Sequence, residues 1–345
     1  MSKTGLVLPQ LDDMHCHFRS GQLLDLVLPF TAKYAGRGVA MPNIKSRPIR
    51  TADDVVWYHD EIERVLDKQP VRPDFTPLMT IEVNDETTPA IISAARRAGA
   101  VAGKVYPRGV TTNSDEGLTS FSTTNALRNF AAMQDVGMLL LIHGEFDRKR
   151  LLVTNREYAF LPTLAVLAFA FPALKIVLEH VSTKAGVQMV KALPKNVAAT
   201  ITVHHLMLTL NDVIGDGVRP HNACMPTPKD FDDRRALRLA AMSGNPKFFP
   251  GSDTAPHRQD EKECEKGKCG VFSAPVLPSA LVEVFEDEGA LDRLPDFVAR
   301  FGAQFYGLPR NTGTIRLVRE EWTVPAIYGN VVPFLAKRKM RWKLV

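Results

Sequence analysis

The chain alternates between short apolar runs and longer stretches in which apolar residues recur every three or four positions. The short runs are rich in Val, Ile and Leu, which is typical of buried β-strands. They cover residues 6–17, 38–43, 75–83, 101–106, 138–143, 174–180, 197–205 and 248–253. The pattern therefore predicts eight strands.

Helical periodicity separates most of these runs. Thr51 and Asp54 have the spacing of a capping box, which marks the start of a helix. An apolar stripe at helical spacing follows, made of Val55, Tyr58, Ile62 and Val65. Further helices are predicted over residues 89–98, 122–135, 156–171, 230–243, 281–288 and 292–301.

Strands that alternate with helices favour a parallel sheet. Eight repeats in 345 residues predict an α/β fold of the (β/α)₈ TIM-like barrel type. A doubly wound open sheet is the competing fold, but no G-x-G-x-x-G pattern follows a strand. No change of composition marks a second domain. We expect one domain over residues 1–345, with helices and a loop-and-strand tail (residues 312–345) after the last barrel strand.

Composition changes this picture little. With 45% hydrophobic and 23% charged residues, the chain has the make-up of a soluble globular protein. The net charge is +5, and Lys and Arg residues are dense only at residues 337–343. We therefore do not expect nucleic acid as a partner. The most apolar stretch, residues 161–178, is broken by prolines and a lysine, and the N-terminus lacks a signal-peptide profile. We therefore expect no membrane span, a cytoplasmic location and four free cysteines.

The polar residues that end the apolar runs are the candidate chemistry. In a barrel the carboxyl ends of all strands meet on one face, where active sites are built. Six of the nine histidines end such a run. The polar run ends are His15, His17, Asn43, Lys104, His143, His180, the His204-His205 pair and Asp253.

His15 and His17 are two residues apart, so an extended chain points both imidazoles to one side. Imidazole is the commonest metal ligand, and Arg19 continues the same parity as an anion-binding arm. A histidine pair on a solvated strand end is the alternative. Lys104 lies inside an apolar run, where an ammonium is costly unless it is paired or deprotonated, and Asp253 needs a cation or donors in the same way.

Four run-end histidines, the lysine and the aspartate would satisfy one another around a metal centre. His204 and His205 are adjacent and point opposite ways in a strand, so we do not expect them to be ligands.

The ordered set of motifs around these residues resembles the amidohydrolase superfamily. Within it, the chain resembles the type II, homodimer-forming dihydroorotases of de novo pyrimidine (UMP) biosynthesis, over essentially its whole length. The matching motifs are residues 12–19 (DDMHCHFR), 41–43 (MPN), 103–107 (GKVYP), 111–114 (TTNS), 143–145 (HGE), 179–183 (EHVST), 218–221 (VRPH) and 251–257 (GSDTAPH).

The resemblance implies two Zn²⁺ ions per subunit and a cyclic amide hydrolase activity. His15, His17 and Asp253 would hold one ion, and His143 and His180 the other. Lys104, N6-carboxylated, would bridge both ions together with a hydroxide. The implied reaction is the reversible cyclisation of N-carbamoyl-L-aspartate to L-dihydroorotate, with Asp253 moving the proton.

The same resemblance implies the substrate contacts. Arg19, Asn43 and His257 would bind the α-carboxylate, for which the planar guanidinium of Arg19 is chemically suited. The loop at Thr111 and Thr112 would close over the substrate. The backbone of Met225 would bind the pyrimidine edge, and Ala274 is a further expected contact.

Two other interpretations remain open at the level of the sequence. A hydantoinase- or allantoinase-like enzyme would share the metal centre without the carboxylate-binding residues. A non-catalytic homologue, acting as a structural partner of another pyrimidine enzyme, would typically have lost ligands, whereas every ligand position is filled here.

Overall fold

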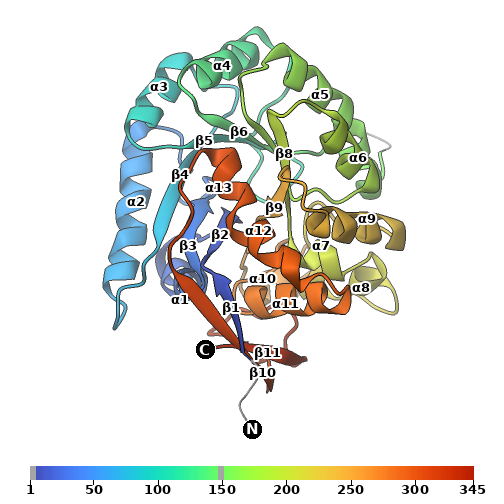
Figure 1. Ribbon diagram of the computed structural model, residues 1–345. Coiled ribbons are helices and arrows are strands. Elements are labelled where there is room, and N and C mark those ends of the chain that lie inside the picture. The colour runs from blue at the N-terminus through green and yellow to red at the C-terminus, as the bar shows by residue number, and fades with distance from the viewer. Residues whose placement is uncertain (1–4, 147–150) are drawn as a thin grey trace.

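The computed structural model describes residues 5–146 and 151–345. Eight parallel strands follow one another in sequence order and curve into a nearly closed barrel (Figure 1). The strands are β2 (Leu11–Cys16), β3 (Ala35–Ala40), β4 (Thr76–Glu82), β5 (Ala102–Val105), β6 (Leu139–His143), β7 (Ile176–Glu179), β8 (Val197–Ile201) and β9 (Phe248–Pro250). The predicted barrel is thus confirmed.

The ring closes just beyond the end of the last strand. Cys16 forms an isolated parallel bridge with Thr254. The Asp253 amide donates to the His15 carbonyl at 2.9 Å, and the His17 amide donates to the Thr254 carbonyl at 3.0 Å. Barrel closure therefore brings the two ends of the candidate site together.

Helices cover the outside of the barrel (Figure 1). The helices between barrel strands are α1 (Gly21–Ala32), α2 (Ala52–Asp67), α3 (Pro89–Arg97), α4 (Thr124–Asp135), α5 (Arg156–Ala170), α6 (Lys184–Ala192), α7 (Val203–Met207), α8 (Asn211–Ile214) and α9 (Phe231–Met242). After β9 come α10 (Gln259–Lys262), α11 (Leu277–Asp287), α12 (Leu294–Ala299) and α13 (Phe301–Tyr306). Helix α2 begins at the predicted capping box of Thr51 and Asp54, and its predicted apolar stripe is buried.

Several predicted boundaries were wrong. Residues 6–17 are two strands, because the chain leaves the first sheet after Pro9 and enters the barrel at Leu11. Residues 197–205 are a strand only to Ile201, because the Thr202 side chain accepts from the His205 amide and starts α7. Helices α1 and α6 were not predicted. The helix predicted over residues 292–301 corresponds to α12, which ends at Ala299, and a separate helix, α13, begins at Phe301.

The chain's first and last strands form a second sheet below the barrel (Figure 1). Strand β1 (Gly5–Pro9) pairs antiparallel with β10 (Thr314–Thr323), which pairs antiparallel with β11 (Lys339–Leu344). The sheet thus joins residues from both ends of the chain. That residues 1–345 form a single domain stays a prediction.

The barrel interior changes from apolar to polar along each strand. Its lower layer is a buried apolar cluster closed off by Phe301 and Tyr306 of α13. The strand residues of this cluster are Met14, Val39, Leu78, Ala102, Leu139, Leu141, Val177, Ala198 and Phe249, together with Met41 just beyond β3. Because alternate residues of a strand face the same side, the next inward positions after Ala102 and Leu141 are Lys104 and His143. The alternation along each strand therefore places the polar residues that end the runs in the upper layer of the barrel interior, above the apolar cluster.

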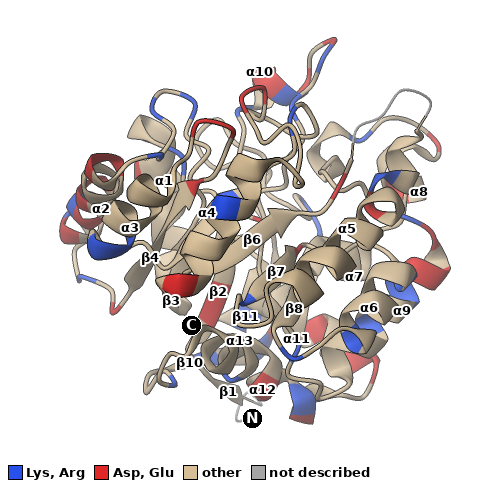
Figure 2. Cartoon of the chain, turned by 90° about the horizontal axis from the view of Figure 1, so that it is seen from above, with Lys and Arg blue, Asp and Glu red and all other residues tan. Residues whose placement is uncertain are grey.

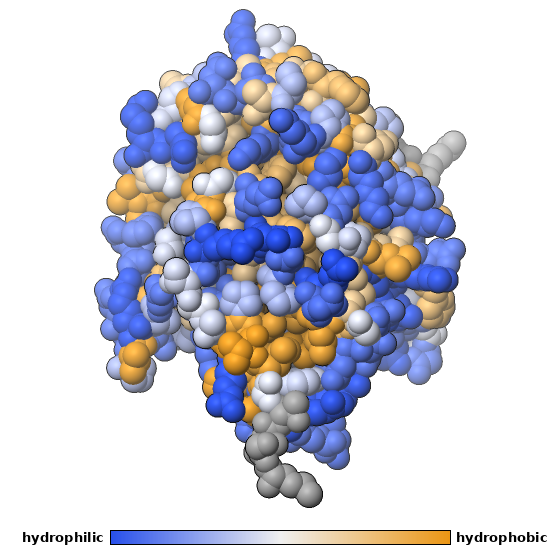
Figure 3. All heavy atoms as spheres, viewed as in Figure 1, coloured by the Kyte–Doolittle hydropathy of each residue, from blue (hydrophilic) through white to orange (hydrophobic). Residues whose placement is uncertain are grey.

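Charged residues of both signs are interspersed on the outer helices and loops (Figure 2). On the face seen in Figure 3, polar residues predominate, and apolar residues gather in its lower half. Among the described residues, no helix combines the length and the apolar character needed to cross a membrane. The four cysteines Cys16, Cys224, Cys264 and Cys269 are free, as predicted.

Candidate active site

Three side chains converge where the barrel closes. The Nε2 atoms of His15 and His17 lie 3.2 Å apart, and both lie close to Oδ1 of Asp253, at 3.3 and 3.1 Å. One ligand atom from each residue falls within 4.8 Å of the others, and all three residues are buried. This is the arrangement that the alternation of His15 and His17 predicted.

The backbone holds these residues in an uncommon conformation. Asp253 has φ of 43°, a left-handed value that is rare outside glycine and clusters at functional sites. Asp13 fixes the turn before it, since its carboxylate accepts from the Ser252 amide at 2.8 Å and from the Tyr34 hydroxyl at 3.1 Å. The structural role of Asp13 was not predicted from the sequence.

Neighbouring carboxylates orient two of the histidines. Glu179 contacts Nδ1 of His15, which leaves Nε2 directed at His17 and Asp253. Glu145 contacts Nε2 of His143 at 2.9 Å, so the other ring nitrogen is the one free for a ligand. Carboxylates that hold the second nitrogen of a metal-ligating histidine are a recurring feature of metal sites. Sequence reasoning missed both carboxylates, although each lies beside a histidine in its motif.

His143 and His180 form the second half of the site. Their ring centroids are 4.7 Å apart, and the His180 ring is 5.2 Å from that of His15. His180 also has a left-handed backbone, with φ of 42°. Its Nδ1 is buried and has no hydrogen-bond partner. Burial, followed by the nearby His143, lowers the pKa of His180 well below its ordinary value, so the ring is neutral and able to act as a ligand.

Lys104 lies on β5 and is fully buried. Its Nζ has no hydrogen-bond partner and sits 5.1 Å from the centre of the Tyr106 ring. Burial lowers the pKa of Lys104 to about 8. A larger fraction of this amine is therefore neutral at physiological pH than for a lysine in water, as reaction with CO₂ requires.

Arg19 and Asn43 lie beside the cluster of His15, His17 and Asp253, and His257 contacts Arg19. Arg19 donates from Nε to the Pro256 carbonyl at 3.0 Å, and its Nη2 lies 3.1 Å from Nε2 of His257. These contacts hold the guanidinium in place against one wall. Asn43 donates to the Thr112 carbonyl at 3.3 Å, which ties it to the predicted loop.

A cavity opens above these residues. Its walls include most of the predicted site, namely His15, His17, Arg19, Asn43, Thr111, Thr112, His143, His180, Met225 and Asp253. Lys104 lies buried outside the lining, and His257 reaches the cavity only through Arg19. The Thr112 hydroxyl contacts the Cys269 carbonyl at 3.4 Å, so the loop lies across the cavity.

The structure does not bring Ala274 to the cavity. Cys269 and Gly270 line the wall instead. Val271 forms a bridge with Thr254, and the chain beyond it runs behind that residue, where the Ala274 amide donates to the Thr254 hydroxyl at 3.2 Å. The expected substrate contact of Ala274 stays a prediction, and the sequence offers no periodicity in this loop that indicates which residue lines the cavity.

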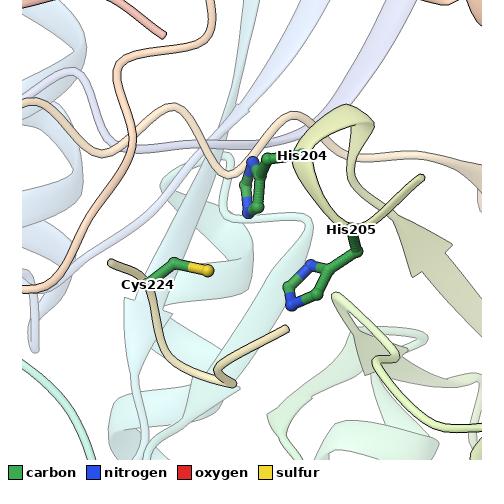
Figure 4. Close-up of side chains that lie close together, drawn as sticks. All are labelled: His204, His205 and Cys224. Carbon is green, nitrogen blue, oxygen red and sulfur yellow. The ribbon is translucent and has the colours of Figure 1, made fainter. Parts of the chain in front are cut away.

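A second group of possible ligands consists of His204, His205 and Cys224 (Figure 4). His205 is fully engaged, because its ring nitrogens contact the Thr202 hydroxyl at 2.7 Å and the Pro226 carbonyl at 2.9 Å. Both ring nitrogens of His204 are buried without a hydrogen-bond partner. His205 therefore has no ring nitrogen free for a metal, whereas His204 has two, and that the histidine pair is not a ligand set stays a prediction.

The residues of the main site fit a pair of divalent cations. Imidazole and carboxylate oxygens are the ligands that zinc uses in hydrolytic enzymes. Lys104, His180 and Glu179 each have a buried polar atom without a partner, and such atoms cost free energy unless something satisfies them. A dinuclear centre would satisfy the lysine, once carboxylated, and the histidine directly.

Comparisons with known proteins agree with this fold. No family model matches the chain. It is 43% identical to a dihydroorotase of Shewanella halifaxensis over 350 residues, which cover 100% of this chain and 99% of that protein. A dihydroorotase of a Marinomonas species is 42% identical over 100% of both chains.

Solved structures give the same result. The dihydroorotase of Campylobacter jejuni superposes with a TM-score of 0.91 at 35% identity and covers 100% of this chain and 98% of its own. The Saccharomyces cerevisiae dihydroorotase, in complex with 5-fluoroorotic acid, gives 0.89 at 34% identity, covering 99% and 98%. A D-hydantoinase matches with a TM-score of 0.72 at 13% identity, which shows a shared fold alone.

The barrel and these relatives define the chain as a cyclic amidohydrolase. Within that class, identity above 40% over the full length is decisive. The chain belongs to the dihydroorotase family.

Proposed function

We propose that the protein catalyses the reversible cyclisation of N-carbamoyl-L-aspartate to L-dihydroorotate in de novo pyrimidine biosynthesis. The observation that carries this proposal is a convergence. The cluster of His15, His17 and Asp253 shares one cavity with the Arg19 guanidinium, in a chain of the dihydroorotase family.

We propose two zinc ions as the cofactor. His15, His17 and Asp253 would hold one, His143 and His180 the other, and carboxylated Lys104 would bridge them with a hydroxide. When bound, the ions polarise the amide carbonyl and acidify water. The support is the fit of the donor set and the orphaned buried atoms of Lys104 and His180.

Asp253 is the proposed proton carrier. Burial alone would raise its pKa, but the adjacent His15 and His17 outweigh that effect, and the pKa of Asp253 lies below its usual range. The carboxylate is therefore charged at neutral pH and able to accept a proton. In the opening direction it takes the proton of the attacking water and gives it to the ring nitrogen as the amide bond breaks. In the closing direction it removes the proton of the ureido nitrogen.

Arg19, with Asn43 and His257, would orient the substrate through its α-carboxylate. Arg19 is partly buried, and its contacts to Pro256 and His257 hold the guanidinium in position. A carboxylate that binds this fork in a bidentate manner is fixed in direction as well as in place. The Thr111–Thr112 loop would exclude bulk water from the cavity. The backbones at Met225 and at Cys269–Gly270 would face the ring edge.

The decisive test is turnover measured together with metal content. Purified protein should hydrolyse L-dihydroorotate, should contain about two zinc ions per chain, and should act far more slowly on hydantoin, which lacks the carboxylate. Faster turnover of hydantoin would overturn the substrate assignment, and a metal-free active protein would overturn the cofactor.

We also propose that the enzyme is a cytoplasmic homodimer of the type II class. The support is the motif pattern of that class. Analytical ultracentrifugation of the purified protein at micromolar concentration should give twice the chain mass of 38.2 kDa, and a stable monomer would contradict it.

A further inference from the structure

Two backbone segments line one wall of the cavity, and they are tied to one another. The Gly270 amide donates to the Ala223 carbonyl at 2.8 Å, and the Ala255 amide donates to the Val271 carbonyl at 2.8 Å. Met225 lies two residues beyond Ala223, and Cys269 lies one before Gly270. These ties therefore set the position of the lining residues Met225 and Cys269.

A buried lysine sits behind this wall. Lys262, the last residue of α10, is 4% exposed. Its Nζ donates to the carbonyls of Gly270 at 2.5 Å and Lys268 at 3.0 Å, with a longer contact of 3.5 Å to the Ala223 carbonyl. One ammonium thus bonds to both wall segments and uses its three donors on backbone alone.

Among the described residues, no carboxylate is an ion-pair partner of this lysine. The thiols of Cys224 and Cys269 lie near it, and burial raises the pKa of each, so they are neutral. Burial lowers the pKa of Lys262 to about 8. The charge is held by carbonyl dipoles, and a buried ammonium without a counter-ion is costly. A purely structural link between two loops needs no charge at all.

The wall leaves little room for adjustment. Gly270 has φ of 149°, and a side-chain carbon placed there would lie 2.3 Å from the Ala255 carbonyl oxygen. The backbone can approach this closely only because the residue is glycine. A small outward shift of the Gly270 carbonyl would therefore change the width of the cavity directly.

We propose that Lys262 is a positioning residue that holds the Met225 and Cys269–Gly270 backbones at the separation required by the six-membered ring of the substrate. The inference rests on the proposed function, because it assigns the ring of dihydroorotate to this wall. Lys262 acts through the carbonyls that it binds and does not touch the substrate.

The test replaces Lys262 by methionine, which keeps the length and removes the donors. The KM for L-dihydroorotate should rise about 10–100-fold, while kcat should change by less than about threefold, because lost ring positioning weakens binding. Zinc content should not change. Lys266→Met is the matched control, since Lys266 is exposed in the same segment, and its KM should stay as in the wild type.

Two further measurements keep the inference testable. Lys262→Gln is the second variant, for use if Lys262→Met does not fold. It retains an amide donor, so its KM should rise by a smaller factor. Binding of orotate, measured by calorimetry, should weaken in parallel with KM. An unchanged KM and orotate affinity in folded Lys262→Met, or a fall in kcat alone, would overturn the inference.

The same binding measurement separates this inference from the proposed function. Wild-type protein that does not hydrolyse dihydroorotate would refute the function. If orotate binding nevertheless weakened in Lys262→Met and not in Lys266→Met, the positioning role of Lys262 would stand.

Discussion

The two ends of the barrel are built on opposite principles. At the carboxyl end of the strands, ionisable side chains are buried with unpartnered atoms, as in Lys104, Glu179 and His180. At the amino end, Leu141 and Phe249 belong to an apolar cluster whose strand residues carry no ionisable side chain. The carboxyl end is organised to bind ligands at a cost in stability, and the amino end contributes to stability but carries no reactive groups.

What separates the two ends is a step of two residues along one strand. Ala102 belongs to the apolar layer, and Lys104 to the polar one. Substitutions at such neighbouring positions should therefore have opposite effects on activity and on the free energy of unfolding.

The largest expected effect is at Lys104. Lys104→Met should reduce turnover to background, a loss of about 10⁴-fold or more, since the proposed bridge between the two zinc ions would be lost. The metal-free protein should become more stable by about 1–3 kcal/mol, because a buried unpaired polar group is removed. Activity assays and urea unfolding after chelation measure the two effects.

Lys175→Met is the control for Lys104→Met. Lys175 lies at the amino end of the barrel, 5.9 Å from the Phe305 ring, and its loss should leave turnover intact. If the Lys104→Met protein were inactive and also less stable than the wild type without metal, the idea that the carboxyl end of the barrel costs stability would be wrong.

Asp253→Asn is expected to lower kcat by about 10²–10⁴-fold, the range for loss of a proton carrier. The fold should persist, and the zinc ion proposed at His143 and His180 should be retained. Steady-state kinetics and metal analysis of the same sample give both numbers. Turnover equal to that of the wild type would remove Asp253 from the mechanism.

Leu141→Ala tests the apolar end. The side chain is fully buried, so the change should lower the free energy of unfolding by about 2–5 kcal/mol. The kcat of the folded protein should change by less than about threefold, since the metal ligands keep their supports. Val166→Ala, at a position that is 66% exposed, should cost less than about 0.5 kcal/mol.

Arg19→Lys has the smallest predicted effect. A point charge replaces a two-pronged donor, so the KM for dihydroorotate should rise about 10–100-fold with a smaller change in kcat. Inhibition by dihydrouracil, which has the ring but no carboxylate, should be unaltered. A KM close to the wild-type value would show that another group binds the carboxylate.

Much of the fold was predictable from the sequence, because strand and helix periods are local properties. The capping box of Thr51 and the eight runs of the barrel are examples. The convergence of His15, His143 and Asp253 also followed, since a parallel barrel leaves only one face for its strand ends.

The remainder depended on contacts between distant segments. Residues 6–17 divide because β1 pairs with β10, which no local pattern reveals. The supporting contact of Glu179 with His15 joins β7 to β2, which lie far apart in the sequence. In the irregular loop before α11, no period indicated that Cys269 would reach the cavity in place of Ala274.

The sheet of β1, β10 and β11 has a consequence for biogenesis. Gly5 pairs with Val318, so the first strand must wait while on the order of 300 residues are translated, or ~15–60 s at 5–20 residues per second. During that interval its backbone donors and acceptors have no native partner, and an unpaired strand edge is a template for association with other chains. The segment made earliest is thus among the latest to reach its native pairing, and chaperone dependence of newly made chains should be concentrated there.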